Sequence, residues 1–166
     1  MGRMRKLRTL PVWLVMVVFS GAALVRAVEQ KSASPVLSGV VERVVDGDTV
    51  VLSGGERVRY IGMDTPELHH PKKPVQAYAR EAMEFNRRLV EGKKIRMELD
   101  VDRRDRYGRL LAYVFRQEDG LFVNAELVKQ GYAQLLTIPP NVRYVELFRK
   151  MQQEAREARR GLWGKR

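Results

Sequence analysis

The chain has 166 residues, of which 45% are hydrophobic and 31% are charged, and its formal net charge is +11. This composition is typical of one folded domain and excludes a disordered or fibrous chain. The sequence contains no cysteine, which excludes a disulfide scaffold, a thiolate zinc site and a cysteine nucleophile. The surplus of positive charge favours a polyanionic partner, with nucleic acid as the first candidate and an acidic membrane surface as the second.

The N-terminus has the features of an export signal. Four basic residues between positions 3 and 8 precede an uncharged, mainly apolar run over residues 10–25. The run is shorter than the roughly 20 residues of a spanning helix, so a cleaved signal is favoured over a retained membrane anchor. In both cases we expect the rest of the chain to be exported, as a secreted, periplasmic or cell-surface protein. The expected parts are a signal or anchor over 1–27, a linker over 28–35 and one domain over 36–166.

The positive charge lies mainly at the two ends of the chain. Residues 1–27 contain five basic residues and no acidic one, and residues 143–166 contain eight basic and three acidic residues. The body over 28–142 therefore has a net charge of only +1. The overall charge identifies no functional site within this body.

The sequence of the exported part predicts five strands and three helices. Runs of β-branched residues separated by Asp-Gly and Gly-Gly turns predict an antiparallel meander, and helical spacing of apolar residues predicts the helices. Five strands with a helix after the third suit a small closed OB-fold barrel, an α+β arrangement with helices at its end. The expected strands cover 36–45, 49–52, 56–63, 93–101 and 109–116, and the expected helices cover 74–91, 123–130 and 144–158.

Three polar clusters lie at ends of these strands, where loops can converge on one site. They cover residues 46–49, 59–67 and 105–109. Each cluster alone also has a structural explanation, as a hairpin turn or as an edge-strand arginine followed by a helix cap. Arg59 and Asp64 have opposite strand parity, so both reach one site only if the chain bends at Gly62.

Together, the clusters supply the groups needed for in-line hydrolysis of a phosphodiester. Asp48 and Asp64 offer hard oxygen ligands, which suit Ca²⁺ or Mg²⁺. Glu67 lies close by in sequence and is placed to orient or deprotonate a water molecule. Arg59 and Arg109 can each grip a phosphate and neutralise the charge of the transition state.

Five ordered segments resemble the successive motifs of the staphylococcal nuclease (thermonuclease) family, and they extend over roughly residues 36–163. The resemblance implies an OB-fold barrel with helices and a Ca²⁺-dependent endonuclease. Such an enzyme cuts DNA and RNA on the 5′ side of the phosphorus and leaves 3′-phosphate ends. The matching segments are 46–50, Arg59 with 64–67, 70–73, 107–113 and 127–131.

The resemblance assigns roles by position. It implies that Asp48 and Asp64 ligate Ca²⁺ together with the backbone carbonyl of Thr65, and that Glu67 is the base that activates water. An exported protein suits this interpretation, because extracellular Ca²⁺ sites work with dissociation constants of about 10⁻⁴ to 10⁻³ M. No protein partner is evident from the sequence, and we expect a monomer.

On the substrate side, the resemblance implies that Arg59 and Arg109 bind and polarise the scissile phosphate and that Tyr107 hydrogen-bonds a terminal phosphate. The sequence departs from the family after Gly131. The best-known member has tyrosines there that stack on the nucleotide base, whereas residues 135–140 here read Leu-Leu-Thr-Ile-Pro-Pro. Stacking on an aromatic ring contributes roughly 1–3 kcal/mol per base, so we expect weaker binding or a different base preference.

Two histidines and two lysines, His69, His70, Lys72 and Lys73, follow the second cluster. The resemblance places them in a loop beside the active site, where they either contact the nucleic-acid backbone or form a solvated loop. The histidines lack the further spaced ligands of a zinc site.

The leading hypothesis is a secreted or membrane-anchored, metal-dependent endonuclease acting on DNA and RNA. One alternative is a non-catalytic OB-fold module that binds nucleic acid at the cell surface, since OB folds often bind single strands without cutting them. Another alternative is that the basic C-terminal helix docks on acidic lipid. The apolar face of that helix, which carries Tyr144, Phe148 and Met151, more simply predicts a contribution to the core.

Overall fold

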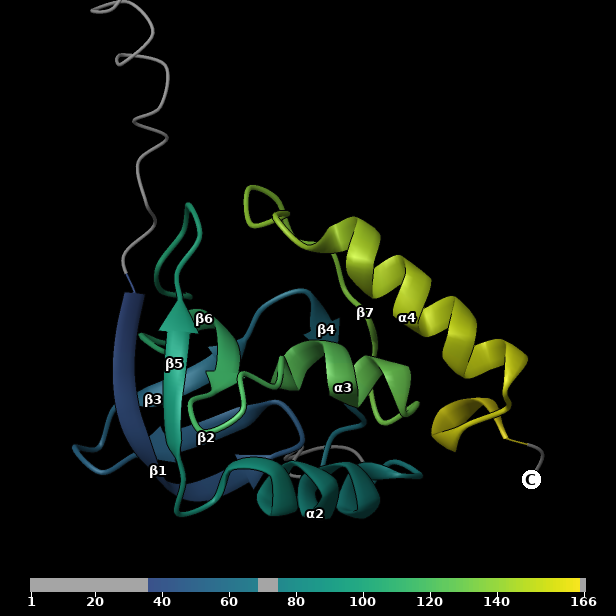
Figure 1. The fold of residues 1–166 in the computed structure, drawn as a ribbon, viewed down its shortest axis with the longest axis horizontal. Coiled ribbons are helices and arrows are strands. Elements are labelled where there is room, and N and C mark those ends of the chain that lie inside the picture. The colour runs from purple at the N-terminus through teal and green to yellow at the C-terminus, as the bar shows by residue number, and fades with distance from the viewer. Residues whose placement is uncertain (1–35, 69–74, 165–166) are drawn as a thin grey trace, which may run out of the picture. The chain divides into compact units, whose positions relative to one another are not determined.

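A computed structural model of the chain describes residues 36–68 and 75–164 (Figure 1). The predicted signal or anchor, the linker and the histidine and lysine loop lie outside the described residues. Within the part that is described, no helix has the length and apolarity needed to cross a membrane.

Five strands form a closed barrel in the order β1-β2-β3-β6-β5 (Figure 1). The first three form the antiparallel meander that the sequence predicts, β3 runs parallel to β6, and β5 is antiparallel to both β6 and β1. This arrangement confirms the predicted OB-fold barrel. The strands are β1 (Val36–Asp46), β2 (Thr49–Leu52), β3 (Arg57–Tyr60), β5 (Lys94–Glu98) and β6 (Leu110–Arg116).

The barrel interior is filled by the apolar residues of its strands. On β3, Val58 and Tyr60 are buried while Arg57 is exposed, which is the alternation expected of a strand with one face on the core. The aliphatic side chains of the barrel strands that are fully buried in this core are Val41, Val50, Val58, Ile95, Met97 and Val114.

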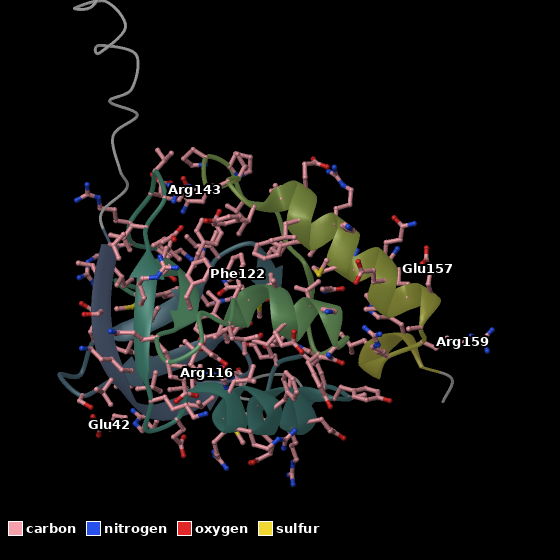
Figure 2. All side chains as sticks on the ribbon, in the orientation of Figure 1. Glu42, Arg116, Phe122, Arg143, Glu157 and Arg159 are labelled. Atoms are coloured by element: carbon pink, nitrogen blue, oxygen red, sulfur yellow. The ribbon has the colours of Figure 1, made fainter. Side chains whose placement is uncertain are left out.

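Outside the barrel, the described residues form three α-helices and a short 3₁₀ helix (Figure 1): α2 (Ala79–Val90), α3 (Val123–Lys129), α4 (Val145–Glu157) and η1 (Gly161–Trp163). The helix α2 packs against β1 and α3 packs against β6, while α4 packs on α3 and β7. Phe122 is partly buried against an apolar cluster, whereas Glu157 and Arg159 project outward at the end of α4 (Figure 2). Phe148 of α4 is fully buried, and Tyr144 and Met151 are partly buried against the same cluster. This face of α4 therefore belongs to the core and is not available to bind lipid.

The elements differ from their predicted bounds in two places that concern the site. The helix predicted from residue 74 begins only at Ala79, because Tyr78 has a left-handed backbone with φ 67°. The single strand predicted over 56–63 is interrupted after Tyr60, and the chain resumes as β4 (Met63–Asp64). The strand β4 pairs with β7 (Gln134–Leu135), which the sequence analysis did not predict.

The interruption depends on Gly62, which has φ 82°. A Cβ atom at this position would overlap the ring of Phe148 and would sit in a backbone region that other residues avoid. We expect Gly62→Ala to lower the free energy of unfolding by about 2–4 kcal/mol, from backbone strain and overpacking combined.

Urea denaturation checks this expectation, with Gly92→Ala as the matched control. Gly92 has φ 73°, but a Cβ there would meet no atom within 4 Å. The control should therefore show only the backbone cost of about 1–2 kcal/mol. Equal losses in the two variants would contradict the packing argument.

Candidate active site

Arg59 joins the carboxylates of two separate segments, the turn between β1 and β2 and the strand β4. The register of β2 and β3 places Thr49 opposite Arg59, and this brings the neighbouring Asp48 within reach. The Nη1 atom of Arg59 lies 3.1 Å from Oδ2 of Asp48, and Nη2 lies 2.7 Å from Oδ1 of Asp64. The bend at Gly62 makes the second contact possible, as the sequence predicts. Arg59 thereby holds the two carboxylates on either side of one guanidinium.

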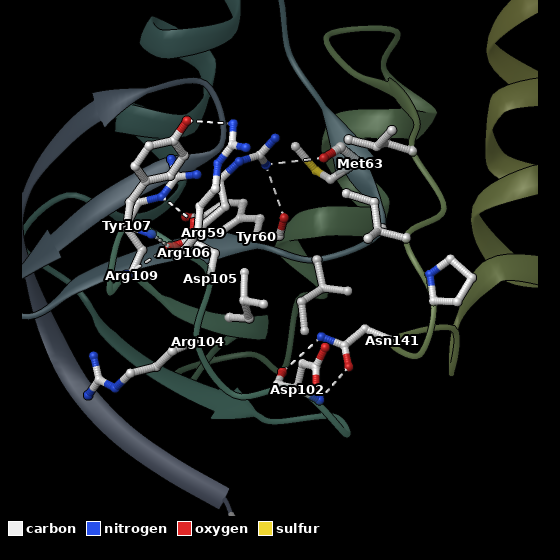
Figure 3. A pocket seen from close by; sticks show the side chains of 16 residues that line it. Arg59, Tyr60, Met63, Asp102, Arg104, Asp105, Arg106, Tyr107, Arg109 and Asn141 are labelled. Atoms are coloured by element: carbon white, nitrogen blue, oxygen red, sulfur yellow. Dashed lines mark hydrogen bonds and ion pairs between the residues drawn. The ribbon is translucent and has the colours of Figure 1, made fainter.

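The guanidinium also stabilises the bend itself. Its Nη1 donates to the carbonyl oxygens of Tyr60, at 3.0 Å, and Met63, at 3.1 Å (Figure 3). The side chain of Arg59 is only 13% exposed. Within the described residues, its Nε makes no hydrogen bond, so a donor remains on the side away from these oxygens. A planar guanidinium suits this combination of tasks because its donors have fixed directions.

Asp48 is buried and is held by the loop that follows Asp64. Its Oδ2 accepts from the backbone N–H of Thr65 at 3.0 Å and from the Thr65 hydroxyl at 2.9 Å. Its Oδ1 accepts from the Thr49 hydroxyl at 3.0 Å. This close approach needs Gly47, since a Cβ atom there would lie 2.7 Å from Oγ1 of Thr65. The Asp-Gly turn is therefore a packing requirement of the site as well as a turn.

Further carboxylates add negative charge around this pair. Burial raises the pKa of Asp64, and although Arg59 lowers it, repulsion from Asp48 and Glu67 raises it further. Burial likewise raises the pKa of Asp46, with repulsion from Asp48 and Glu67 adding to the effect. Four carboxylates thus lie close enough to repel one another, with Arg59 bound to two of them. The local excess of negative charge would be relieved by a bound cation.

Glu67 is exposed, and its backbone is fixed by Gln76. The N–H of Glu67 donates to Oε1 of Gln76 at 3.0 Å, and the N–H of Gln76 donates to the carbonyl of Glu67 at 3.2 Å. These reciprocal bonds join two residues that lie nine positions apart in the chain. They hold the Glu67 backbone while its carboxylate remains in solvent.

Arg109 is positioned by Asp105 in the loop before β6. Its Nε lies 2.7 Å from Oδ2 of Asp105, whose Oδ1 accepts from the backbone N–H groups of Tyr107 and Arg109. Partial burial acts to raise the pKa of Asp105, but these hydrogen bonds and the charge of Arg109 leave the pKa lowered. Because the ion pair uses Nε, the terminal nitrogens of Arg109 remain as donors that can meet an anion.

Arg59, Tyr107 and Arg109 line one pocket of about 530 Å³ (Figure 3). Tyr107 is 67% exposed, and the guanidinium carbons of Arg106 and Arg109 lie 4.8 Å and 5.5 Å from the centre of its ring. This volume lies in the range of small-ligand sites. The pocket thus offers several cationic groups beside an exposed aromatic ring.

The opposite wall of this pocket is aliphatic. It is formed by Leu136, Ile138 and Pro139, and Ile138 is 62% exposed. Two hydrogen bonds of 2.8 Å between Asn141 and the backbone of Asp102 hold this segment in place. The segment that lacks the expected tyrosines is therefore part of the pocket lining.

Comparison with known proteins identifies the family of the chain. The model of the family described as "Staphylococcal nuclease homologue" matches residues 57–165. The chain belongs to the staphylococcal nuclease family. It is 39% identical to a thermonuclease of Staphylococcus intermedius over 129 residues, which cover 76% of each chain. It is also 39% identical to the endonuclease YncB of Bacillus subtilis (strain 168) over 149 residues, 82% of this chain and 70% of the relative. These findings confirm the predicted family and a hydrolase acting on ester bonds.

In this member of the staphylococcal nuclease family, the predicted residues fall into two groups. Asp48, Arg59, Asp64 and Thr65 are joined by direct contacts, and Glu67 lies beside them. Tyr107 and Arg109 reach the same pocket as Arg59 from the other side. Among the described residues, no three His, Cys, Asp or Glu side chains form a group that would hold a metal ion by themselves.

The sequence analysis missed two positioning residues of this family member. Asp105 was expected only as part of the polar cluster 105–109, whereas in the structure it binds Arg109 through an ion pair. Gln76 fell inside the predicted helix, and no local pattern points to its bond with Glu67. It could be found only from the folded chain.

Proposed function

We propose that the protein is a Ca²⁺-dependent endonuclease that hydrolyses phosphodiester bonds of DNA and RNA. The observation that carries the proposal is that Arg59 pairs with Asp48 and Asp64 at the edge of the pocket that Arg109 also lines. Cationic and anionic groups are thus placed side by side, as a phosphate and a metal ion together require. The names of the relatives, thermonuclease and endonuclease, support the same activity.

The donors suit a hard cation. Asp48 and Asp64 offer carboxylate oxygens, and Thr65 between Asp64 and Pro66 offers a backbone carbonyl. The repulsion that raises the pKa of Asp46 and Asp64 is the electrostatic condition that a divalent cation relieves. Two carboxylates and a carbonyl leave the remaining positions of such an ion to water, as is usual for Ca²⁺ and Mg²⁺. When bound, the cation would supply Lewis-acid stabilisation of the phosphate charge.

In the proposed mechanism, each residue acts on the phosphate or on water. Arg59, through Nε and Nη2, and Arg109, through its terminal nitrogens, hold the nonbridging oxygens and stabilise the charge that accumulates on them. Glu67 takes the proton of the attacking water as the water oxygen bonds to phosphorus. The bond from phosphorus to the 5′ oxygen breaks, and that oxygen takes up a proton from solvent. The contacts with Gln76 hold the backbone of Glu67 in place. Tyr107 donates its hydroxyl to a neighbouring phosphate of the strand.

Assays with plasmid DNA and with RNA test the function. Protein spanning residues 28–166 is incubated with each substrate in millimolar Ca²⁺, in Mg²⁺, or in EDTA. We expect cleavage of both nucleic acids in Ca²⁺, 3′-phosphate ends, and no cleavage in EDTA. Salt-dependent binding without cleavage would instead support a non-catalytic binding module.

We further propose that the protein works outside the cytoplasm, as a monomer, after export by residues 1–27.

The aliphatic wall leads to a prediction about substrate affinity. A tyrosine at position 138 would present a ring to the base across the pocket from Tyr107, and stacking contributes about 1–3 kcal/mol per base. We expect Ile138→Tyr to lower KM about tenfold with little change in kcat. Steady-state cleavage of a short DNA oligonucleotide measures both constants. The control Val36→Tyr changes an exposed residue on β1 and should leave both constants unaltered.

A further inference from the structure

A second pocket lies on the other side of the segment over residues 59–66, which we call the catalytic segment. It has a volume of about 420 Å³ and is lined by Asp64, Thr65, Pro66, Gln76, Ala77, Gln134 and Leu162. The first pocket includes every residue from Arg59 to Met63, and the second includes the three that follow. The chain that carries Arg59 and Asp64 therefore separates two pockets, both of the size that small ligands occupy.

This arrangement fits the covalent structure of a nucleic acid. Every internal phosphodiester has one nucleoside on each side, so an endonuclease must accommodate two nucleosides around the phosphate that it cuts. The phosphate-binding arginines line the first pocket, and the carboxylate of Asp64 lines the second. A strand whose phosphate lies between these groups passes from one pocket to the other.

The lining of the second pocket is amide-rich and suits a neutral base. The described residues that line it include two amides and no basic side chain. Gln76 and Gln134 are both exposed and carry side-chain amides that can donate and accept hydrogen bonds at base edges. Gln76 uses Oε1 on Glu67, which leaves its NH₂ group as a donor. Leu162 and Ala77 supply apolar surface for the flat face of a base.

Gln134 is fixed by the short sheet that the sequence analysis did not predict. Its backbone pairs with Asp64 in the β4–β7 ladder. Gln134, which would contact the base, is therefore held opposite Asp64 of the catalytic segment. This pairing gives the second pocket a defined position relative to the reacting phosphate.

We propose that the second pocket binds the nucleoside on the opposite side of the scissile phosphate from the first pocket, with Gln134 and Gln76 hydrogen-bonding to its base. The inference rests on the nuclease function proposed above. It assigns this pocket the task of base contact, whereas the first pocket combines phosphate contact with an aliphatic and aromatic surface.

The test uses an oligonucleotide with one natural phosphodiester, all other linkages being methylphosphonates. Three versions are compared: one with both neighbouring bases, one abasic on the 5′ side of that linkage and one abasic on the 3′ side. Both kcat/KM and the equilibrium affinity by fluorescence anisotropy are measured. The variants are Gln134→Met, which keeps size but removes the amide, and Ala77→Trp, which fills the pocket from an exposed position. Gln153→Met on α4 is the matched control.

We expect Gln134→Met and Ala77→Trp each to lower kcat/KM and affinity about tenfold on the complete substrate. On the version that lacks the base of the second pocket, both variants should match the wild type. On the version that lacks the base of the first pocket, the tenfold loss of both variants should persist. For Ile138→Ala, which changes the first pocket, we expect a loss on the version that lacks the base of the second pocket and none on the version that lacks the base of the first. Gln153→Met should behave as wild type throughout.

The inference is overturned if Gln134→Met cuts and binds all three versions as the wild type does, or if its loss is equal on all three. Failure of the proposed function has a different result, in which the wild type cuts none of the versions. In that case the affinities still decide whether the second pocket binds a base.

Discussion

Arg59→Met is expected to lower kcat about 10²- to 10³-fold, the usual cost of losing one donor that stabilises transition-state charge. Two effects combine in this change. The phosphate loses a guanidinium, and Asp48 and Asp64 lose the group that holds them 3.1 and 2.7 Å away on its two sides. Single-turnover cleavage of a DNA oligonucleotide at saturating protein measures the rate of the chemical step directly.

Arg59→Lys sharpens this expectation, because an ammonium keeps the charge but lacks the planar fork. It should recover only a small part of the lost rate. Arg149→Met is the matched control, since Arg149 is an exposed residue of α4 whose side chain pairs with Glu146 one turn earlier. Recovery of the full rate by lysine would show that the geometry described for Arg59 is unnecessary.

Glu67→Gln is expected to lower kcat about 10²- to 10⁴-fold, the range usual for a general base, while changing KM little. The side chain is exposed and its backbone is held by Gln76, so the amide should enter the same position without disturbing the fold. The split between kcat and KM distinguishes a role in chemistry from a role in binding.

Glu118→Gln provides the control for this substitution, because Glu118 is an exposed carboxylate that pairs with Lys93 and Arg116 away from the pocket. Its kinetic constants should equal those of the wild type. If Glu67→Gln retained more than a tenth of the wild-type kcat, another group would have to accept the proton from water.

The fold was predictable from the sequence because its signals are local. Alternating apolar residues and Asp-Gly or Gly-Gly turns specify the strands β1 to β3, and the apolar run of β6 specifies a strand with neighbours on both sides. The interruption at Gly62 was predictable only in part. The opposite parity of Arg59 and Asp64 required a bend, but the contact with Phe148 that makes glycine necessary comes from α4.

Several features of the site depend on contacts between distant segments. The β4–β7 pair joins Asp64 to Gln134, and the Asn141 bonds to Asp102 fix the aliphatic wall. Each of these contacts joins only one or two residues of one segment to one or two of the other. Segments this short show no periodic pattern of apolar residues in the sequence. Such short, non-local pairings leave no sequence signal, which is why the residue types of the site were predictable and the second pocket was not.

We expect phosphodiester cleavage to depend on a cation that Asp48 and Asp64 hold. The most direct measurement is the cleavage rate of one DNA oligonucleotide against free Ca²⁺, for the wild type and for Asp64→Asn, with Asp119→Asn as a surface control. The wild type should show no cleavage in EDTA and a half-maximal rate at about 10⁻⁴ to 10⁻³ M Ca²⁺. Asp64→Asn should need at least tenfold more Ca²⁺. A wild-type rate that persists in EDTA, or identical curves for the wild type and Asp64→Asn, would contradict the proposed role of the two carboxylates in holding the cation.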